Sequence, residues 1–501
     1  MYNLRKDYFF KIITNIFRIP ISFLLQSIFP RILGPIQYGN FEFLNDSFTR
    51  ILTFLESGNT LAFYTRLSSN KSDYKLIKFY KIIVLLTILI IFLILFIICY
   101  FNFNIYLWPN QTITTLILVT ILVILVYISN ILIRILDSFL LTISIEKLKV
   151  IHIAITFLIF VFFYFWTNSI NINYFILIQI CLQIFLILGS IYIINNNYNS
   201  VVFIKETLTS LNIKFYIQYF YKYSSPLFIF SVFALIFGFG DRWLLQKFGG
   251  SIQQAYFSLA QKTGAFIFIF TSAVIPLYIR ENSKHFYNSD HFKMAESYIK
   301  NIKLFMFLTI FLSTIISFNS KYILLLIGGD SFSDANNLFI LMSFYPIHQT
   351  LGQLNGVLYY STNRTKIFTK VGLFSLPLGF LFSFILIAPY KYYGFNLGSI
   401  GLAIQMLIIQ FVNQNILLFK NCQYLKISFL NLFLNQLSTI IIFLTFGFVS
   451  IYLLQFINIS NKFIFLCFFS IFLFLFSIIV LLINPKLIGL NNIFNLLNNK
   501  S

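Results

Sequence analysis

Ionisable side chains lie inside two apolar segments near the start of the chain. The segment Ile12–Leu33 holds Arg18, and the segment Phe41–Tyr64 holds four further charged residues, which are Glu42, Asp46, Arg50 and Glu56. A charge in hydrocarbon costs about 2.5–3.5 kcal/mol on insertion scales, so this many charges must face a wet or paired interior. Guanidinium groups bind phosphate oxygens through paired hydrogen bonds, and carboxylates can hold cations or protons. The pattern predicts a site for a charged ligand at membrane depth.

A second set of charges lies near the middle of the chain. Asp241 and Arg242 stand near the end of the segment Pro226–Leu245, and Lys262 lies in the segment Tyr256–Tyr278. No acidic residue stands three or four positions from Arg18 or Lys262, so these two are the sharper candidates for holding an anion. Asp241 and Arg242 could equally form a cap at the membrane surface.

The charged residues divide into two predicted roles. We expect the cations to contact an anionic headgroup such as a diphosphate, and these are Arg18, Arg31, Arg50, Arg242 and Lys262. We expect the carboxylates to balance these charges or carry a coupling ion, and these are Glu42, Asp46, Glu56 and Asp241. An alternative remains open, because Glu42, Asp46 and Arg50 share one helix face and could form a purely intrahelical ladder of ion pairs.

The elements that must position these residues are membrane helices. Hydrophobic residues make up 59% of the 501 positions and charged residues only 10%. Apolar runs of about 20 residues recur along the chain, and about fourteen of them meet the criterion for a membrane span. The predicted fold is an all-α polytopic membrane protein, with no segment left over for a soluble domain. Four scattered cysteines favour neither a disulfide nor a metal site, and we expect no cofactor.

The net charge of +21 is distributed in a way that predicts orientation rather than nucleic-acid binding. Basic residues gather in every second connection between the apolar runs, as in the connection that holds Arg66, Lys71, Lys75, Lys78 and Lys81. Short cytoplasmic connections are the ones that collect Lys and Arg. We therefore expect both termini to be cytoplasmic, in the terminal segments that hold Lys11 and Lys500. The first apolar run contains Arg18 and ends in Pro-Arg, which is typical of a retained span rather than a signal peptide.

A short internal repeat suggests two related halves. Arg31-x-x-Gly34-Pro35-Ile36-Gln37 after the first span is similar to Lys247-x-x-Gly250-Ser251-Ile252-Gln253 after the seventh. We expect a six-helix lobe over residues 1–200, a cytoplasmic linker over 201–225, a second six-helix lobe over 226–425, and two added helices with a tail over 426–501. Six spans per half keep the orientation, so the repeats would be parallel, and the charged segments would converge on a cleft between the lobes.

Two stretches resemble the signatures of a known family. Pro30-Arg31-Ile32-Leu33-Gly34-Pro35-Ile36-Gln37-Tyr38-Gly39 resembles the R-x-L-G-P-x-x-Y-G signature of the polysaccharide-export flippases. Asp241-Arg242-Trp243-Leu244-Leu245, followed by Tyr256-Phe257-Ser258-Leu259-Ala260, is similar to the D-R-x-x-L and Y-x-x-A signature of the second half. The chain departs from the pattern at Gln37 and over Lys247–Gly250. The family is that of the O-antigen and repeat-unit flippases, in the superfamily that also contains the MATE exporters.

The resemblance implies a transporter rather than an enzyme. It implies a cationic central cavity that takes an undecaprenyl-diphosphate-linked oligosaccharide, for O-antigen, capsule or a related glycan, from the cytoplasmic to the outer face of a bacterial inner membrane by alternating access. Membrane lipid and other glycan-assembly proteins would be its partners, and nucleic acid would not. A drug or cation antiporter of the same superfamily is the nearest alternative. A glycan polymerase or ligase is less favoured because the predicted outer connections are short, and an ATP-driven pump lacks a G-x-x-x-x-G-K-[ST] loop in this sequence.

Overall fold

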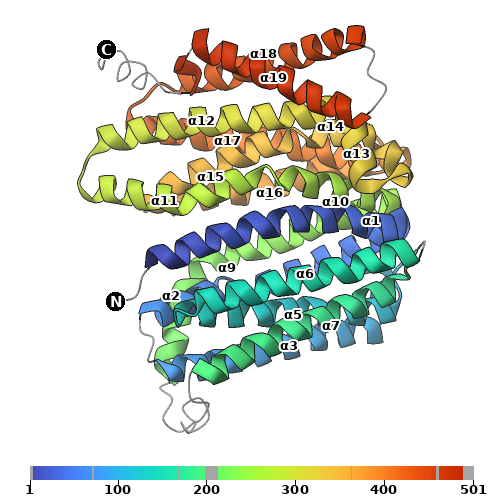
Figure 1. Cartoon of the computed structure of the whole chain (residues 1–501). Helices are drawn as coiled ribbons and strands as arrows, with labels where there is room; N and C mark the ends of the chain where they lie inside the picture. The colour runs from blue at the N-terminus through green and yellow to red at the C-terminus, as the bar shows by residue number, and fades with distance from the viewer. Residues whose placement is uncertain are drawn as a thin grey trace. The chain divides into compact units, whose positions relative to one another are not determined.

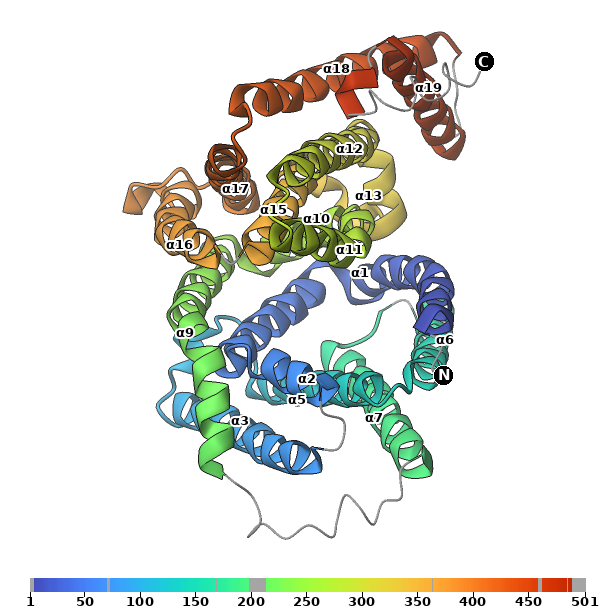
Figure 2. The same ribbon diagram turned by 90° about the vertical axis from the view of Figure 1, so that its left-hand side faces the viewer.

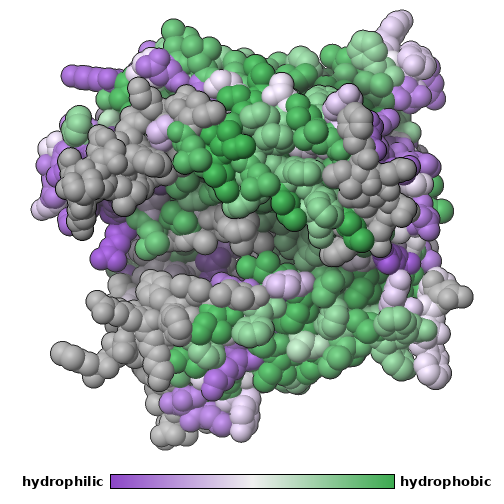
Figure 3. Space-filling model, turned by 45° about the horizontal axis from the view of Figure 1, so that its top comes forward, coloured by the Kyte–Doolittle hydropathy of each residue, from purple (hydrophilic) through white to green (hydrophobic). Residues whose placement is uncertain are grey.

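The computed structural model describes residues 4–69, 73–167, 169–197, 213–362, 364–457, 462–483 and 485–488. All regular secondary structure in these ranges is helical. Eleven helical segments there are long and apolar enough to cross a membrane. Hydrophobic side chains predominate on the face drawn in Figure 3. The prediction of an all-α polytopic membrane protein is confirmed.

The structure has eleven candidate spans in the described residues, whereas the sequence predicts about fourteen. The numbers differ because some predicted spans are joined in one helix and others are divided between two. Ile13–Glu56 takes in nearly all of the first predicted span and most of the second, whose end lies in α2, and Phe228–Ala265 takes in most of the seventh and the start of the eighth. The predicted span from Ala335 to Tyr359 is divided between α14 (Asn336–Met342) and α15 (Tyr345–Ser361), each shorter than a full membrane crossing. Hydropathy locates apolar stretches well, but it does not show whether a helix breaks or continues at their ends.

The chain forms two compact units, Met1–Ala255 and Tyr256–Ser501. The helices of the first unit are α1 (Leu4–Glu56), α2 (Asn59–Ser69), α3 (Tyr74–Tyr100), α4 (Asn104–Leu107), α5 (Ile113–Ser138), α6 (Thr142–Trp166), α7 (Ile172–Asn197), α9 (Ile213–Leu244) and the π-helical η2 (Leu245–Gly249). Helix α10 (Gly250–Ala265) starts in the first unit and ends in the second. A continuous helix therefore joins the two units.

Helix α1 organises the first unit. Its two halves meet at Gly34, and the chain leaves the N-terminus and returns to α2 at the same end (Figure 1). The first half packs along α6 and the second half packs along α9, while α5 and α7 lie side by side (Figure 2). The α3 and α5 helices begin at side-chain caps, where Asp73 accepts from the Leu76 N–H at 3.1 Å and Thr112 accepts from the Thr115 N–H at 3.3 Å.

The second unit is built around α12 (His291–Phe318). Its other helices are α11 (Phe268–Tyr287), α13 (Ser320–Gly328), η3 (Asp330–Ala335), α14, α15, α16 (Thr365–Ile387), η4 (Tyr390–Tyr392), α17 (Gly398–Leu425), α18 (Phe429–Ile457), α19 (Lys462–Ile483) and η5 (Pro485–Ile488). Tyr298, Ile302 and Ile310 of α12 lie in a buried apolar core with Leu351 of α15 and Phe443 of α18. Asp290 caps α12, and its hydrogen bonds with the Lys293 side chain and N–H hold the pKa of Asp290 below its ordinary value.

A buried polar network crosses the second unit. The Tyr298 hydroxyl donates to Asn355 Oδ1 at 2.6 Å, and the Asn421 amide donates to the Tyr298 oxygen at 3.2 Å. Arg364 Nη2 donates to Asn421 Oδ1 at 3.0 Å. This network joins α12, α15 and α17, and it agrees with the expectation that Asn355 makes interhelical hydrogen bonds.

Some predicted positions lie outside the described residues. These are Lys71 and Lys500, together with residues 198–212 and 489–501, which contain the first part of the predicted linker and the end of the predicted tail. The described residues from Ile213 onward belong to α9. The division into two repeated lobes stays a prediction.

Candidate functional site

The break in α1 depends on one glycine. Gly34 has φ 69° and ψ 170°, a backbone conformation that only glycine adopts readily. Gly250, its counterpart in the internal repeat, has φ 76° and ψ −177°. The two glycines thus share a backbone conformation, which Gly329 also adopts with φ 75° and ψ −173°, and the internal repeat stays a prediction.

The residues around Gly34 fasten this joint to its neighbours. A Cβ on Gly39 would lie 1.8 Å from the Ser251 carbonyl oxygen, so α1 and α10 approach as closely as their backbones allow. Arg31 Nη1 donates to the Tyr164 hydroxyl of α6 at 3.2 Å. Buried Tyr38 is hydrogen-bonded to Glu42. The stretch singled out in the sequence thus has a structural role, which is to hold the two halves of α1 in place.

Arg18 belongs to a cluster around a buried carboxylate, and we call Glu146, Arg18, Lys149 and Thr14 the Glu146 cluster. Glu146 of α6 has no exposed side-chain surface, and it accepts from Arg18 Nη1 at 3.2 Å and from Thr14 Oγ1 at 3.2 Å. Lys149 pairs with the other carboxylate oxygen. The side chain of Arg18 is 29% exposed, and that of Lys149 is 15% exposed. One acid thus holds two cations in place, and both cations retain access to a ligand.

Sequence reasoning missed Glu146 and Lys149. Both residues lie inside α6, which already begins at Thr142. The spacing of three between Glu146 and Lys149 was the available signal, since such residues share one helix face. The pairing of Arg18 with Glu146 joins α1 to α6 over a distance in sequence that local spacing does not reveal.

A second group lies between the second half of α1 and α9, and we call Asp46, Arg50, Arg242 and Gln254 the Asp46 cluster. Asp46 accepts from Arg50 Nε at 2.6 Å and Nη2 at 3.2 Å, which is a bidentate pair. Arg242 Nε lies 3.9 Å from the same carboxylate, and Arg242 Nη1 donates to Gln254 Oε1 at 3.2 Å. The predicted ladder on α1 exists between Asp46 and Arg50, but it extends to α9 and is not purely intrahelical.

The Asp46 cluster is crowded and largely buried. A Cβ on Gly238 of α9 would lie 2.2 Å from Arg50 Nη1, so the absence of a side chain there leaves room for the guanidinium. Arg242 is only 7% exposed, and Glu42 is 5% exposed. Asp241 and Glu42 also act electrostatically on Arg242. Asp46 is thus the carboxylate that contacts both guanidinium groups, and Glu42 and Asp241 add further negative charge near Arg242.

The remaining predicted residues lie elsewhere. Glu56 lies near enough to Tyr80 and Tyr127 to act electrostatically on their hydroxyl groups. Lys262 lies in the last turn of α10, within the second unit, where it is partly buried and in contact with neighbouring groups. Within the described ranges, no three His, Cys, Asp or Glu side chains lie close enough together to share a metal ion. Of the predicted residues of the first unit, Arg18 thus belongs to the Glu146 cluster, and Asp46, Arg50 and Arg242 belong to the Asp46 cluster. Arg31 and Glu56 belong to neither.

No family model and no curated protein matches the chain. Several solved structures do match the chain. The lipid II flippase MurJ, in an inward closed conformation, is 17% identical, covers 95% of this chain and 99% of its own, and has a TM-score of 0.63. An inward-facing multidrug resistance MATE family transporter of the MOP superfamily is 12% identical over 81% of this chain and 94% of its own, with a TM-score of 0.60. A MOP superfamily transporter from Pyrococcus furiosus, described as having a binding pocket of reverse polarity, is 12% identical over 83% of this chain and 95% of its own, with a TM-score of 0.52.

Fold and site together define a polytopic helical membrane protein with ion-paired clusters inside its helices. Its particular fold is the one shared by the MurJ flippase and the MATE transporters of the MOP superfamily.

Proposed function

We propose that this protein is a flippase for a lipid-linked oligosaccharide. It would move undecaprenyl-diphosphate-linked repeat units of O-antigen, capsule or a related surface glycan from the cytoplasmic to the outer face of the bacterial inner membrane. The observation that carries the proposal is the likeness in fold to the lipid II flippase MurJ, which covers nearly all of both chains. The family resemblance of the stretch around Gly34 points the same way.

The extent of this likeness favours a flippase over a drug exporter. The MurJ match covers 95% of the chain, so it must include most of residues 426–501, the segment that contains α18 and α19. The MATE structure covers 81% of the chain, which leaves room to omit that segment. A multidrug or cation antiporter remains the second candidate, because the TM-scores of the two structures are close.

The Glu146 cluster is the proposed place for the diphosphate in the first lobe. Arg18 and Lys149 would turn from Glu146 toward the phosphate oxygens, and the carboxylate would hold the two cations apart when no substrate is bound. Burial of Glu146 makes the return of both cations favourable once the substrate leaves, because an unpaired buried carboxylate is costly. Lys262, in the second unit, stays a separate candidate for an anion contact, and Arg31 would stay bound to α6 as part of the joint.

The Asp46 cluster is the proposed coupling site. Asp46 lies between Arg50 and Arg242, and a cation or proton that entered the cluster would compete with both guanidinium groups for this carboxylate. Movement of either arginine would alter the contact between α1 and α9. We propose that this change accompanies alternating access, with both chain termini on the cytoplasmic side.

A reconstituted assay tests the function. Proteoliposomes would hold a fluorescent undecaprenyl-diphosphate-linked sugar, and translocation would be read as protection from a membrane-impermeant quencher. We expect Arg18→Ala to reduce the translocation rate at least tenfold. Its fold should survive, since Lys149 still pairs with Glu146. The matched control is Lys420→Ala, an exposed cation on α17 that should change little.

Two results would count against the proposal. Normal translocation by Arg18→Ala would remove the Glu146 cluster from the mechanism. Failure of the unmodified protein to move the labelled lipid, combined with proton- or sodium-driven export of a cationic dye such as ethidium, would identify an antiporter instead.

A further inference from the structure

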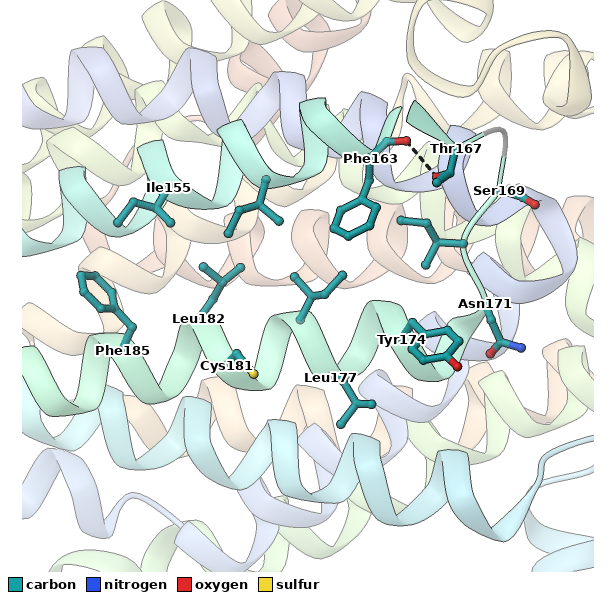
Figure 4. A pocket seen from close by; sticks show the side chains of 13 residues that line it. Ile155, Phe163, Thr167, Ser169, Asn171, Tyr174, Leu177, Cys181, Leu182 and Phe185 are labelled. Carbon is teal, nitrogen blue, oxygen red and sulfur yellow. Dashed lines mark hydrogen bonds between the residues drawn. The ribbon is translucent and has the colours of Figure 1, made fainter. Parts of the chain in front are cut away.

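An apolar groove runs between α6 and α7, away from both charged clusters. Its volume is about 790 Å³. One wall is a stripe on α6 at helical spacing, formed by Ile155, Ile159 and Phe163. The facing wall on α7 includes Leu182 and Phe185, and Figure 4 shows the two sets of side chains lining the space between the helices. The groove exists because α6 packs mainly on α1 and α7 packs mainly on α5, so the two helices diverge.

One end of the groove is polar. Thr167, Ser169 and Asn171 line it in the short connection between α6 and α7, beside Tyr174 at the start of α7 (Figure 4). The end of α6 nearby carries Phe165 and Trp166, which are 82% and 77% exposed. Exposed aromatic residues at a helix end are typical of the boundary between hydrocarbon and headgroups. This end of the groove therefore lies at the membrane surface.

The length of the groove matches one leaflet. From Ile155 to Thr167 the α6 helix rises about 18 Å, at 1.5 Å per residue. The hydrocarbon of one leaflet is about 15 Å thick, half of a bilayer core of about 30 Å. The groove thus extends from the headgroup level to the middle of the bilayer.

We propose that this groove binds a phospholipid, with one acyl chain between α6 and α7 and its headgroup beside Thr167, Ser169 and Asn171. The polar lining carries no charge, so recognition rests on the acyl chain and on neutral hydrogen bonds at the mouth. The charge pattern of the connections assigns this end of the helices to the outer leaflet.

The bound chain would also brace the joint of α1. The Ile170 N–H, in the connection that lines the groove, donates to the Ile32 carbonyl at 3.1 Å, two residues before Gly34. On the same helix as the groove wall, Glu146 pairs with Arg18. A lipid that fixes α6 and the connection therefore stabilises elements on which both the joint and the Glu146 cluster depend. The proposed site does not depend on what the protein transports.

The test is photo-crosslinking of lipid to the full chain. The protein would be reconstituted in vesicles of phosphatidylethanolamine and phosphatidylglycerol with a tracer phosphatidylcholine that carries a diazirine in its acyl chain. We expect mass spectrometry to find labelling concentrated in the α6 and α7 peptides. Ile159→Trp should fill the groove and reduce that labelling at least threefold relative to peptides of α18.

The matched control is Leu158→Trp, one residue along the same helix but outside the groove lining. It should leave the labelling pattern unchanged. Ile155→Trp provides a second filling variant if Ile159→Trp is not monodisperse, and native mass spectrometry should find one retained phospholipid in the unmodified chain and none in the filled variant. Labelling spread evenly over all lipid-facing helices, or unaffected by both filling variants, would overturn the proposed site.

Discussion

At the scale of single residues, Glu146 is the side chain on which the Glu146 cluster depends. It is completely buried, yet it holds two cations that are not. A buried acid of this kind contributes through its partners, because removing its charge leaves those partners without compensation. The same reasoning explains why Arg18 alone looked like an anion ligand in the sequence. Its nearest counter-charge is 128 positions away in the chain.

Glu146→Gln tests this reading directly. The amide keeps the shape of the side chain but leaves the partly exposed Arg18 and Lys149 without a counter-charge, so we expect a loss of about 1–3 kcal/mol of stability. A short-chain prenyl diphosphate should restore part of it, because its phosphates would replace the missing carboxylate. The measurement is the thermal unfolding midpoint in detergent, with and without the diphosphate.

The matched variant is Asp290→Asn, which removes an acid that pairs with Lys293 outside the membrane. It should show neither a large loss nor any recovery. If the diphosphate fails to raise the midpoint of Glu146→Gln, the two cations do not face a ligand.

At the scale of helices, glycines decide where α1 can approach its neighbours. The sequence predicts the break at Gly34 because the Gly-Pro pair interrupts an apolar run, and the structure has the break there. The close contact of Gly39 with Ser251 could not be predicted in the same way. It depends on the packing of segments that lie more than two hundred residues apart, and nothing in the local pattern distinguishes Gly39 from a helical glycine of no consequence.

Gly39→Ala measures that contact. Because the nearest atoms are the Ser251 carbonyl and the Ala255 nitrogen, which are backbone, the added methyl can be accommodated only if the helices move apart. We expect a loss of about 1–3 kcal/mol, and more if the backbone resists. The readout is again thermal unfolding in detergent.

Gly356→Ala is the comparison. It lies inside α15, and its added methyl would meet only the Tyr360 ring at 3.5 Å. Alanine favours a helix over glycine by about 1 kcal/mol, so this change should be neutral or stabilising. Equal effects of the two substitutions would mean that the α1–α10 contact carries no special cost.

At the scale of the whole molecule, hydropathy predicts the membrane class and nearly all helices, since burial in lipid leaves a strong local signal. Which charged residues pair with one another was harder to predict from the sequence. The convergence of Arg18, Arg50 and Lys262 on one cleft stays a prediction, and the first unit pairs Arg18 with Glu146 and Arg50 with Asp46. Which charges meet is decided by helix packing, and a single sequence carries little information about packing between distant segments.

The orientation of the whole chain can be measured with cysteine labelling. Lys391 lies in a connection that we assign to the outer side, and Lys293 lies at the start of α12 on the side that we assign to the cytoplasm; both are exposed. In intact cells, we expect a membrane-impermeant maleimide to label Lys391→Cys and not Lys293→Cys, with both labelled after permeabilisation. The unsubstituted chain gives the background of its four cysteines. The reverse pattern would show that the charge distribution had been misinterpreted.

The helix α10 belongs to both compact units, and this has a mechanical consequence. A helix is a stiff rod, so it cannot absorb a rotation of one unit against the other along its own length. Any pivot must sit where the rod begins or stops: at Gly250, where the π-helical turn η2 ends, or at the step between Ala265 and Phe268.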